Sequence, residues 1–233
     1  MMRGRRPLLR RHLLRLALLL AAIAAPWLLA SVPVPPGLVA APSGGAAWAA
    51  EARNSTPAHP LDDTALLKAL RGGGLIVFFR HGATDFSRDD TRMRDFDDCD
   101  HQRMLSDQGR AGLRAIARQW QRLALPVGRV LASPYCRTRE SAELLFGRYE
   151  RADAVRGGPL EEGADRYVEL RKIFASRPEP GKLLVVVSHA NPFHAVAGPP
   201  YLGEAEAAVL RPLGTGRWEV IARVTPDAWA RLH

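Results

Sequence analysis

The chain alternates between short apolar runs and longer stretches in which apolar positions recur every three or four residues. Three segments predict strands: residues 75–79, 127–132 and 182–187. Apolar runs of this length, bounded by glycine or polar residues, are typical of strands buried in a mostly parallel sheet. Two further runs, 207–213 and 218–224, flank Gly214-Thr215-Gly216 and therefore predict a C-terminal hairpin.

Two of the periodic stretches carry clear signals for the start and end of a helix. Asp62 or Asp63 is expected to cap a short helix that ends at glycines 72–74. Ser106 is expected to cap a longer helix that Pro126 stops.

Two more helices are expected over residues 138–146 and 161–174, and Gly147 ends the first of them. Residues 84–104 are crowded with aspartate and arginine and hold few apolar side chains, so they predict a long loop. The alternation of strands and helices predicts an α/β fold, a three-layer α/β/α sandwich with a mostly parallel central sheet and a C-terminal hairpin.

The N-terminal residues have the layout of a secretory signal. Six arginines and no acid are followed by the apolar stretch 16–30, which Pro26 interrupts. Arg10 and Arg11 precede two apolar residues and another base, a pattern that resembles the twin-arginine export signal. A permanent anchor is the main alternative, but a membrane span needs about 20 uninterrupted apolar residues.

Ala47-Trp48-Ala49 fits the small-x-small rule for signal cleavage. We therefore expect an export signal with a Pro/Ala-rich segment over residues 1–49 and one folded domain over residues 50–233. The sequence predicts a location in the periplasm or outside the cell, with membrane contact only through the N-terminal signal. It predicts no oligomeric state.

Most of the positive charge of the chain belongs to this N-terminal segment. Without residues 1–49 the chain has 27 basic and 24 acidic residues, a formal charge of +3. The remaining arginines are interspersed with acids, and no stripe of alternating aromatic and basic residues is present. This pattern argues against a nucleic-acid-binding protein.

Basic side chains follow all three predicted parallel strands. Arg80 and His81 come directly after the first strand, Arg137 lies a few residues beyond the second, and His189 follows the third. The carboxyl ends of parallel strands meet at one sheet edge, so these four side chains are expected together. Guanidinium groups bind phosphate oxygens and a neutral imidazole can attack phosphorus, which predicts phosphoryl-transfer chemistry.

Each of these residues also has a purely structural interpretation. Arg137 can pair locally with Glu140, and His189 can simply end its strand with both ring nitrogens satisfied. If Arg137 faces His81, Cys99 and Cys136 are expected close enough to form a disulfide that ties the long loop to the site. Two free buried thiols are the alternative.

Residues 75 to about 198 resemble the histidine phosphatase superfamily, the phosphoglycerate-mutase-like group (branch 1). The resemblance rests on four segments: Leu75-Ile76-Val77-Phe78-Phe79-Arg80-His81-Gly82-Ala83-Thr84, Leu105-Ser106-Asp107-Gln108-Gly109-Arg110, Ala132-Ser133-Pro134-Tyr135-Cys136-Arg137-Thr138-Arg139-Glu140-Ser141-Ala142 and Val187-Ser188-His189-Ala190-Asn191-Pro192. It implies the family's fold, with His81 as the nucleophile that becomes phosphorylated and Arg80, Arg137 and His189 as ligands of the phosphoryl oxygens. It implies no metal or organic cofactor.

The chain departs from the family where a proton donor is usual. Glu161 and Glu162 are the nearest match in the segment before the last parallel strand, without the surrounding pattern, and we take Glu161 as the candidate. Both glutamates are also ordinary first-turn residues of a helix. Asp85 is another candidate donor, and Asn191 a candidate substrate-binding residue. A well-placed acid is worth about 10²-fold to 10⁴-fold in rate.

These observations predict an exported phosphatase that hydrolyses phosphate monoesters through a phosphohistidine on His81. Its expected partner is a phosphorylated small molecule or envelope component. Three alternatives remain: an exported protein that binds such a ligand with weak or no turnover, a mutase-type phosphotransferase, and a structural envelope protein. The mutase is disfavoured because its substrates are cytoplasmic.

Overall fold

The computed structural model describes residues 61–157 and 165–233. The predictions for residues 1–49 therefore lie outside the described residues. Within the two described ranges, no helix has the length and apolar character needed to cross a membrane.

A six-stranded mixed sheet forms the centre of the domain, in the order β3-β2-β4-β1-β5-β6. Strands β1 to β4 run parallel, whereas β5 is antiparallel to β1 and pairs with β6 as a hairpin. The predicted mostly parallel sheet and its hairpin are confirmed. The strands are β1 (Ile76–Arg80), β2 (Val127–Ala132), β3 (Glu150–Arg151), β4 (Leu183–Ser188), β5 (Ala207–Gly214) and β6 (Arg217–Val224).

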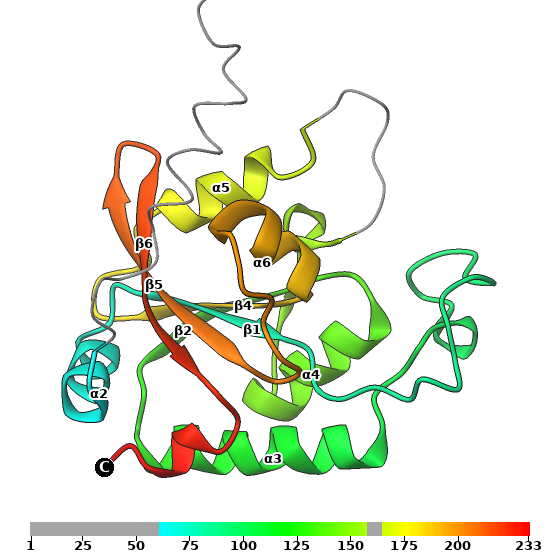
Figure 1. Ribbon diagram of the computed structural model, residues 1–233, viewed down its shortest axis with the longest axis horizontal. Helices are drawn as coiled ribbons and strands as arrows, with labels where there is room; N and C mark the ends of the chain where they lie inside the picture. The colour runs from blue at the N-terminus through cyan, green and yellow to red at the C-terminus, as the bar shows by residue number, and fades with distance from the viewer. Residues whose placement is uncertain (1–60, 158–164) are drawn as a thin grey trace, which may run out of the picture. The chain divides into compact units, whose positions relative to one another are not determined.

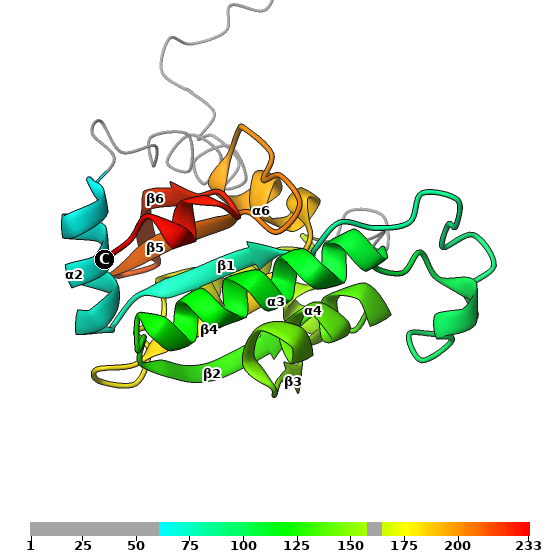
Figure 2. The same ribbon diagram turned by 90° about the horizontal axis from the view of Figure 1, so that it is seen from below.

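Helices cover both faces of this sheet, as Figure 1 and Figure 2 show. Buried side chains of α2, α3 and α4 pack on one face, and those of α5 and α6 pack on the other. The expected three-layer sandwich is therefore the observed architecture. The helices are α2 (Asp63–Gly72), α3 (Asp107–Arg122), α4 (Cys136–Phe146), α5 (Val168–Ala175) and α6 (Ala190–Ala197), with short 3-10 turns at Cys99–His101, Asp153–Val155 and Ala228–Ala230.

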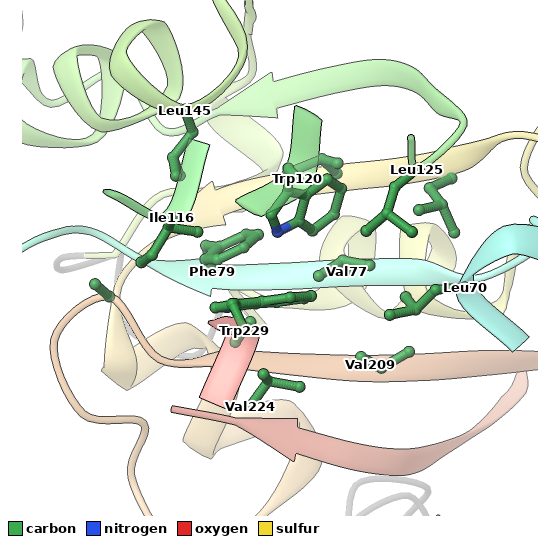
Figure 3. Packing of buried hydrophobic residues seen from close by; sticks show 14 of the residues in the cluster. Leu70, Val77, Phe79, Ile116, Trp120, Leu125, Leu145, Val209, Val224 and Trp229 are labelled. Atoms are coloured by element: carbon green, nitrogen blue, oxygen red, sulfur yellow. The ribbon is translucent and has the colours of Figure 1, made fainter. Parts of the chain in front are cut away.

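Strand β1 is held by aromatic side chains on both of its faces. Figure 3 shows Phe79 beside Trp120 and Trp229, and its ring centroid lies 5.7 and 5.9 Å from theirs. On the opposite face Phe78 contacts Phe174, with ring centroids 5.7 Å apart. Truncating a buried phenylalanine to alanine typically costs about 3–5 kcal/mol. The residues that follow β1 therefore leave a firmly anchored strand.

The predicted helix starts at Asp62 and Ser106 are confirmed. The Asp62 carboxylate accepts from the Ala65 amide at 2.7 Å, and the Ser106 hydroxyl accepts from the Gly109 amide at 3.0 Å. Gly147, in the left-handed conformation at φ 67°, ends α4 as expected. Helix α3 ends before Pro126, at Arg122, so the proline is not its direct stop.

Two helices differ from their predictions. Helix α5 begins at Val168, not near residue 161, because the Asp165 carboxylate accepts the Tyr167 amide at 3.0 Å and forms a turn there. Helix α6 follows β4, where only a strand end was expected. Its Pro192 lies in the first turn, where a missing N–H costs no helical hydrogen bond.

The long loop after β1 projects from the carboxyl end of that strand in Figure 1 and Figure 2. A disulfide joins Cys99 in this loop to Cys136 at the start of α4, which confirms the predicted bridge. Beside it the buried Gln102 side chain donates to the Phe96 carbonyl at 3.2 Å and accepts from the Cys136 amide at 2.9 Å. The loop is therefore fixed to α4 by both covalent and hydrogen bonds.

The loop also approaches α3 closely. A Cβ atom on Gly109 would lie 2.1 Å from the Ala83 carbonyl oxygen, so a residue with a side chain cannot occupy this position without backbone movement. The Ser106 amide donates to the same carbonyl at 3.0 Å. The start of α3 is thereby fixed against the turn that carries His81.

Replacing Cys99 and Cys136 together by serine is expected to lower the free energy of unfolding by about 3–4 kcal/mol, because the bridge closes a long loop in the unfolded chain. The two cysteines are 37 residues apart. Urea denaturation without reductant measures the effect. Reductant should destabilise the wild type to the level of the serine variant and leave that variant unchanged. Equal urea midpoints for both proteins without reductant would contradict the prediction.

Candidate active site

A cavity of about 160 Å³ lies where β1, β2 and β4 end. Strands β1 and β4 pair up to Arg80 and Ser188, so the residues that follow them are neighbours. The cavity brings together all four basic residues expected at this edge. It is lined by Arg80, His81, Arg103, Tyr135, Arg137, Gly157, His189, Ala190 and Asn191.

The His81 ring is buried, with 2% of the residue exposed. Its Nδ1 lies 2.8 Å from the carbonyl oxygen of Gly82. A carbonyl oxygen only accepts, so Nδ1 must carry the proton, and in the neutral ring Nε2 then holds the lone pair. The backbone therefore selects the tautomer that a nucleophile acting through Nε2 requires.

His189 faces His81 across the cavity, with ring centroids 5.4 Å apart. Its Nε2 lies 2.9 Å from the hydroxyl oxygen of the buried Ser133. When this hydroxyl donates to Nε2, the ring proton stays on Nδ1, and that tautomer can donate to a bound anion. Ser133 was not among the predicted site residues, although it lies in the segment 132–142 that resembles the family.

Arg80 is oriented from the segment that precedes β5. Its Nη1 donates to the Leu202 carbonyl at 2.8 Å, and its Nη2 lies 3.7 Å from the Glu204 carboxylate. Glu204 also accepts from the amide and hydroxyl of Thr84. Arg80 and the turn after His81 therefore share one carboxylate.

Arg137 is the second residue of α4, and its side chain is 6% exposed. Its Nη1 donates to Asp90 at 3.0 Å, and the guanidinium lies over the Tyr135 ring at 4.5 Å. The local pair with Glu140 is not formed, because Glu140 binds Arg110 at 2.6 Å. Arg137 thus faces the cavity and contacts the long loop.

The Ser141 hydroxyl links the segment that carries Arg80 and His81 to the segment that carries Arg137. It accepts from the Gly82 amide at 3.1 Å and donates to the Arg137 carbonyl at 2.7 Å. This buried bridge fixes the turn after β1 against the first turn of α4. The relative position of His81 and Arg137 depends on it.

Arg103 is a cavity residue that the sequence analysis missed. It comes from the long loop, and its guanidinium lies over the Phe86 ring at 4.9 Å. Its charge contributes to the lowered pKa values of both cavity histidines. No sequence signal separates this arginine from the others in the loop.

The candidate proton donors lie either outside the described residues or beside another hollow. Glu161 and its alternative Glu162 lie outside the described residues, which stop at Gly157 on the cavity wall and resume at residue 165. Asp85 lines a neighbouring hollow of about 770 Å³. Hydrogen bonds from Ser87 lower the pKa of Asp85, which makes it a poor proton donor. Among the described residues, the cavity lining contains no carboxylate.

Asn191, the predicted substrate-binding residue, does line the cavity, together with Ala190. Both belong to the first turn of α6. The first N–H groups of a helix have no partner within it and carry partial positive charge, so this end of α6 favours an anion.

The arrangement suits an anion with several oxygens. Three guanidinium groups supply donors in fixed planar geometry, and two neutral imidazoles supply a lone pair and a further donor. The part of the chain that the structure describes holds no group of three or more histidine, cysteine, aspartate or glutamate side chains placed to bind a metal ion.

Both histidines are neutral at pH 7. Burial lowers the pKa of His81 from 6.5 to about 3. The hydrogen bond to Gly82 opposes this shift, whereas the positive charges of the cavity arginines add to it. Burial likewise lowers the pKa of His189 well below 6.5. An imidazolium has no lone pair, so this electrostatic environment keeps His81 competent as a nucleophile under mildly acidic conditions.

The lowered pKa values predict how stability depends on pH. Below pH 6.5 the unfolded chain binds protons at His81 and His189 that the native protein excludes, so stability is complete above 6.5 and falls as the pH decreases toward 3. The slope approaches about 1.4 kcal/mol per pH unit for each histidine. Urea denaturation at pH 7, 6 and 5 measures it. A His81→Gln variant should show a shallower decline, and a wild type equally stable at pH 7 and 5 would contradict the prediction.

The chain was compared with curated proteins and with solved structures. Among curated proteins none matches this chain. Among solved structures it is similar to the protein histidine phosphatase SixA complexed with tungstate, at 17% identity over 66% of this chain and 97% of that one, with a TM-score of 0.49. A putative phosphohistidine phosphatase SixA from Agrobacterium tumefaciens is 20% identical over 66% and 99%, with a TM-score of 0.46. A mycobacterial glucosyl-3-phosphoglycerate phosphatase is 17% identical over 64% and 97%, with a TM-score of 0.49.

The sequence profile described as the histidine phosphatase superfamily (branch 1) matches residues 76–156. The matched range includes Arg80, His81 and Arg137, three of the residues gathered at the cavity. His189 lies beyond it, directly after β4, the strand that pairs with β1. Over residues 76–156 the chain therefore matches the histidine phosphatase superfamily, branch 1.

Proposed function

We propose that this protein is a phosphatase that hydrolyses phosphate monoesters through a phosphohistidine on His81 and that it acts outside the cytoplasm. The observation that carries the proposal is a buried, neutral His81 in a cavity lined by three arginines, with its Nδ1 proton held by the Gly82 carbonyl. The substrate is a phosphorylated small molecule or an envelope component.

The reaction has two steps. In the first, the Nε2 lone pair of His81 attacks phosphorus, a P–N bond forms, and the ester P–O bond breaks while the leaving oxygen takes up a proton. In the second, water attacks the phosphohistidine, the P–N bond breaks, and inorganic phosphate leaves with His81 restored. Arg80, Arg137 and His189 bind the phosphoryl oxygens and stabilise the charge that develops on them.

Glu161 is the proposed donor of the proton to the leaving group. It follows Gly157, a cavity residue, by four positions in the chain. A Glu161→Gln variant should lose most activity toward alkyl phosphates and little toward an aryl phosphate, whose leaving group needs less protonation. The Glu162→Gln variant is the matched control. If it loses more activity toward alkyl phosphates than Glu161→Gln does, Glu162 is the proton donor instead.

A binding protein without turnover is the second candidate, because the described cavity lining supplies no carboxylic acid. A panel of phosphate monoesters incubated with the purified protein separates the two. Release of inorganic phosphate, with an acid-labile and base-stable phosphoryl group trapped on the protein by rapid quenching, supports the phosphatase. Retention of a phosphorylated ligand without release would overturn it.

Export is proposed from residues 1–49 alone. Fractionation of cells that produce the full chain should place it outside the cytoplasm. Replacing Arg10 and Arg11 by lysine keeps the charge and removes the arginine pair. Cytoplasmic retention of this variant supports the twin-arginine route, and cytoplasmic location of the wild type would overturn export.

A further inference from the structure

One carboxylate oxygen of the long loop contacts two of the three arginine segments that meet at the cavity. Asp90 Oδ1 accepts from Nη1 of Arg137 at 3.0 Å and from the backbone amide of Arg103 at 2.9 Å. The same Nη1 lies 3.4 Å from the Arg103 carbonyl oxygen. The loop and the first turn of α4 are therefore joined around Asp90.

The burial of Arg137 makes this contact matter. Its side chain is 6% exposed, whereas that of Asp90 is 31% exposed. A buried guanidinium that loses its carboxylate is left with an uncompensated charge and with freedom to change rotamer. Burial lowers the pKa of Arg137 and the contact with Asp90 opposes this shift, as expected for a partner of the charged form.

The two cavity arginines that have carboxylate neighbours are held differently. Arg80 is fixed mainly by the Leu202 carbonyl at 2.8 Å, with Glu204 at 3.7 Å. Arg137 has its shortest polar contact with Asp90 itself. Loss of the carboxylate should therefore disturb Arg137 more than loss of Glu204 would disturb Arg80.

We propose that Asp90 is a positioning residue, which holds Arg137 and the Arg103 segment in the geometry that receives a phosphoryl group. It acts through these arginines and does not line the cavity itself. The proposal rests on the proposed phosphatase function. Under this proposal the site needs the hydrogen bonds of Asp90. The negative charge of Asp90 weakens phosphate binding, because it repels an incoming anion.

Two substitutions separate geometry from charge. Asp90→Asn keeps an oxygen that can accept from Arg137 and from the Arg103 amide but removes the charge. Asp90→Ala removes both. Asp89→Ala is the matched control, because the adjacent Asp89 carboxylate accepts only local hydrogen bonds from the Thr91 amide at 2.9 Å and hydroxyl at 2.6 Å.

Turnover of an aryl phosphate and inhibition by inorganic phosphate are measured for all four proteins. Asp90→Ala should lower kcat by about 10-fold to 100-fold, since a misplaced catalytic group costs up to about 10²-fold, and should weaken phosphate inhibition. Asp90→Asn should keep kcat within about 3-fold of the wild type and bind phosphate more tightly, since one nearby like charge is removed. Asp89→Ala should match the wild type.

A merely structural role gives a different pattern, in which Asp90→Ala lowers the melting temperature while kcat and phosphate inhibition per folded molecule stay unchanged. That result overturns the proposal, as does an Asp90→Asn variant as impaired as Asp90→Ala. If Asp90→Ala does not fold, the Asp90→Asn variant tests the proposal. Tighter phosphate binding by this variant supports it, and unchanged or weaker binding contradicts it. Calorimetric titration with inorganic phosphate needs no turnover, so an inactive wild type refutes the phosphatase function while this titration still tests Asp90.

Discussion

Replacing His81 by alanine is expected to reduce turnover of any phosphate monoester by at least about 10⁴-fold. In the proposed reaction the phosphoryl group is transferred to the imidazole before water removes it. Removing the nucleophile of a comparable covalent mechanism lowers kcat by about 10⁴-fold or more. His189, the other histidine of the described cavity lining, does not replace it, because its Nε2 is engaged with Ser133.

The same variant should keep its affinity for inorganic phosphate within about 10-fold, since the guanidinium groups that bind the anion remain. It should form no phosphoenzyme on rapid quenching. His194→Ala is the matched control, because this histidine stacks on Tyr201, with ring centroids 3.9 Å apart, and does not line the cavity. Turnover by the His81→Ala protein above about one hundredth of the wild-type rate would end the phosphohistidine mechanism.

Replacing Arg137 by alanine is expected to lower kcat/KM by about 10²-fold to 10³-fold, the effect of removing one donor that stabilises charge on the reacting group. The loss has a second part here, because Asp90 then remains beside the cavity without its partner and opposes an incoming phosphoryl group. Arg137→Lys should recover only part of the activity, since an ammonium group cannot reproduce the planar contacts with Asp90 and the Tyr135 ring.

Arg129→Ala is the control for this series. Its guanidinium pairs with Glu150 on the surface at 2.6 Å, and such exposed pairs contribute about 0–1 kcal/mol. Its kinetics should equal those of the wild type. The combined Arg137→Ala and Asp90→Asn variant should be less impaired than the Arg137→Ala variant, because the unpaired charge is gone while an acceptor for the Arg103 amide remains. Wild-type kcat/KM in the Arg137→Ala protein would exclude this arginine from the site.

The parts of this fold that sequence reasoning predicted are those with a local physical cause. A buried parallel strand has to be apolar on both faces, so β1 and β4 are visible as continuous runs. The caps Asp62 and Ser106 are visible because a short polar side chain must satisfy the first amides of a helix. Because parallel strands end at the same sheet edge, the proximity of His81 and His189 could be predicted without knowledge of their contacts.

The parts that escaped prediction depend on contacts distant in sequence. Asp90 and Arg103 belong to a loop of repeated charges, where no period distinguishes a buried partner from a solvated side chain. Helix α6 has only eight residues, and the proline in its first turn indicated the end of a regular element and not the start of a helix. Strand β3 has two exposed residues and no apolar pattern. In each of these cases tertiary pairing decides the outcome.

The place of the disulfide has a consequence for how the protein matures. Cys136 and Arg137 are adjacent residues in the first turn of α4, and the bridge from Cys136 draws in the loop that holds the counter-ion of Arg137. Formation of the bridge restricts the loop to conformations in which Asp90 stays near Arg137. Oxidation therefore preorganises the anion-binding pocket.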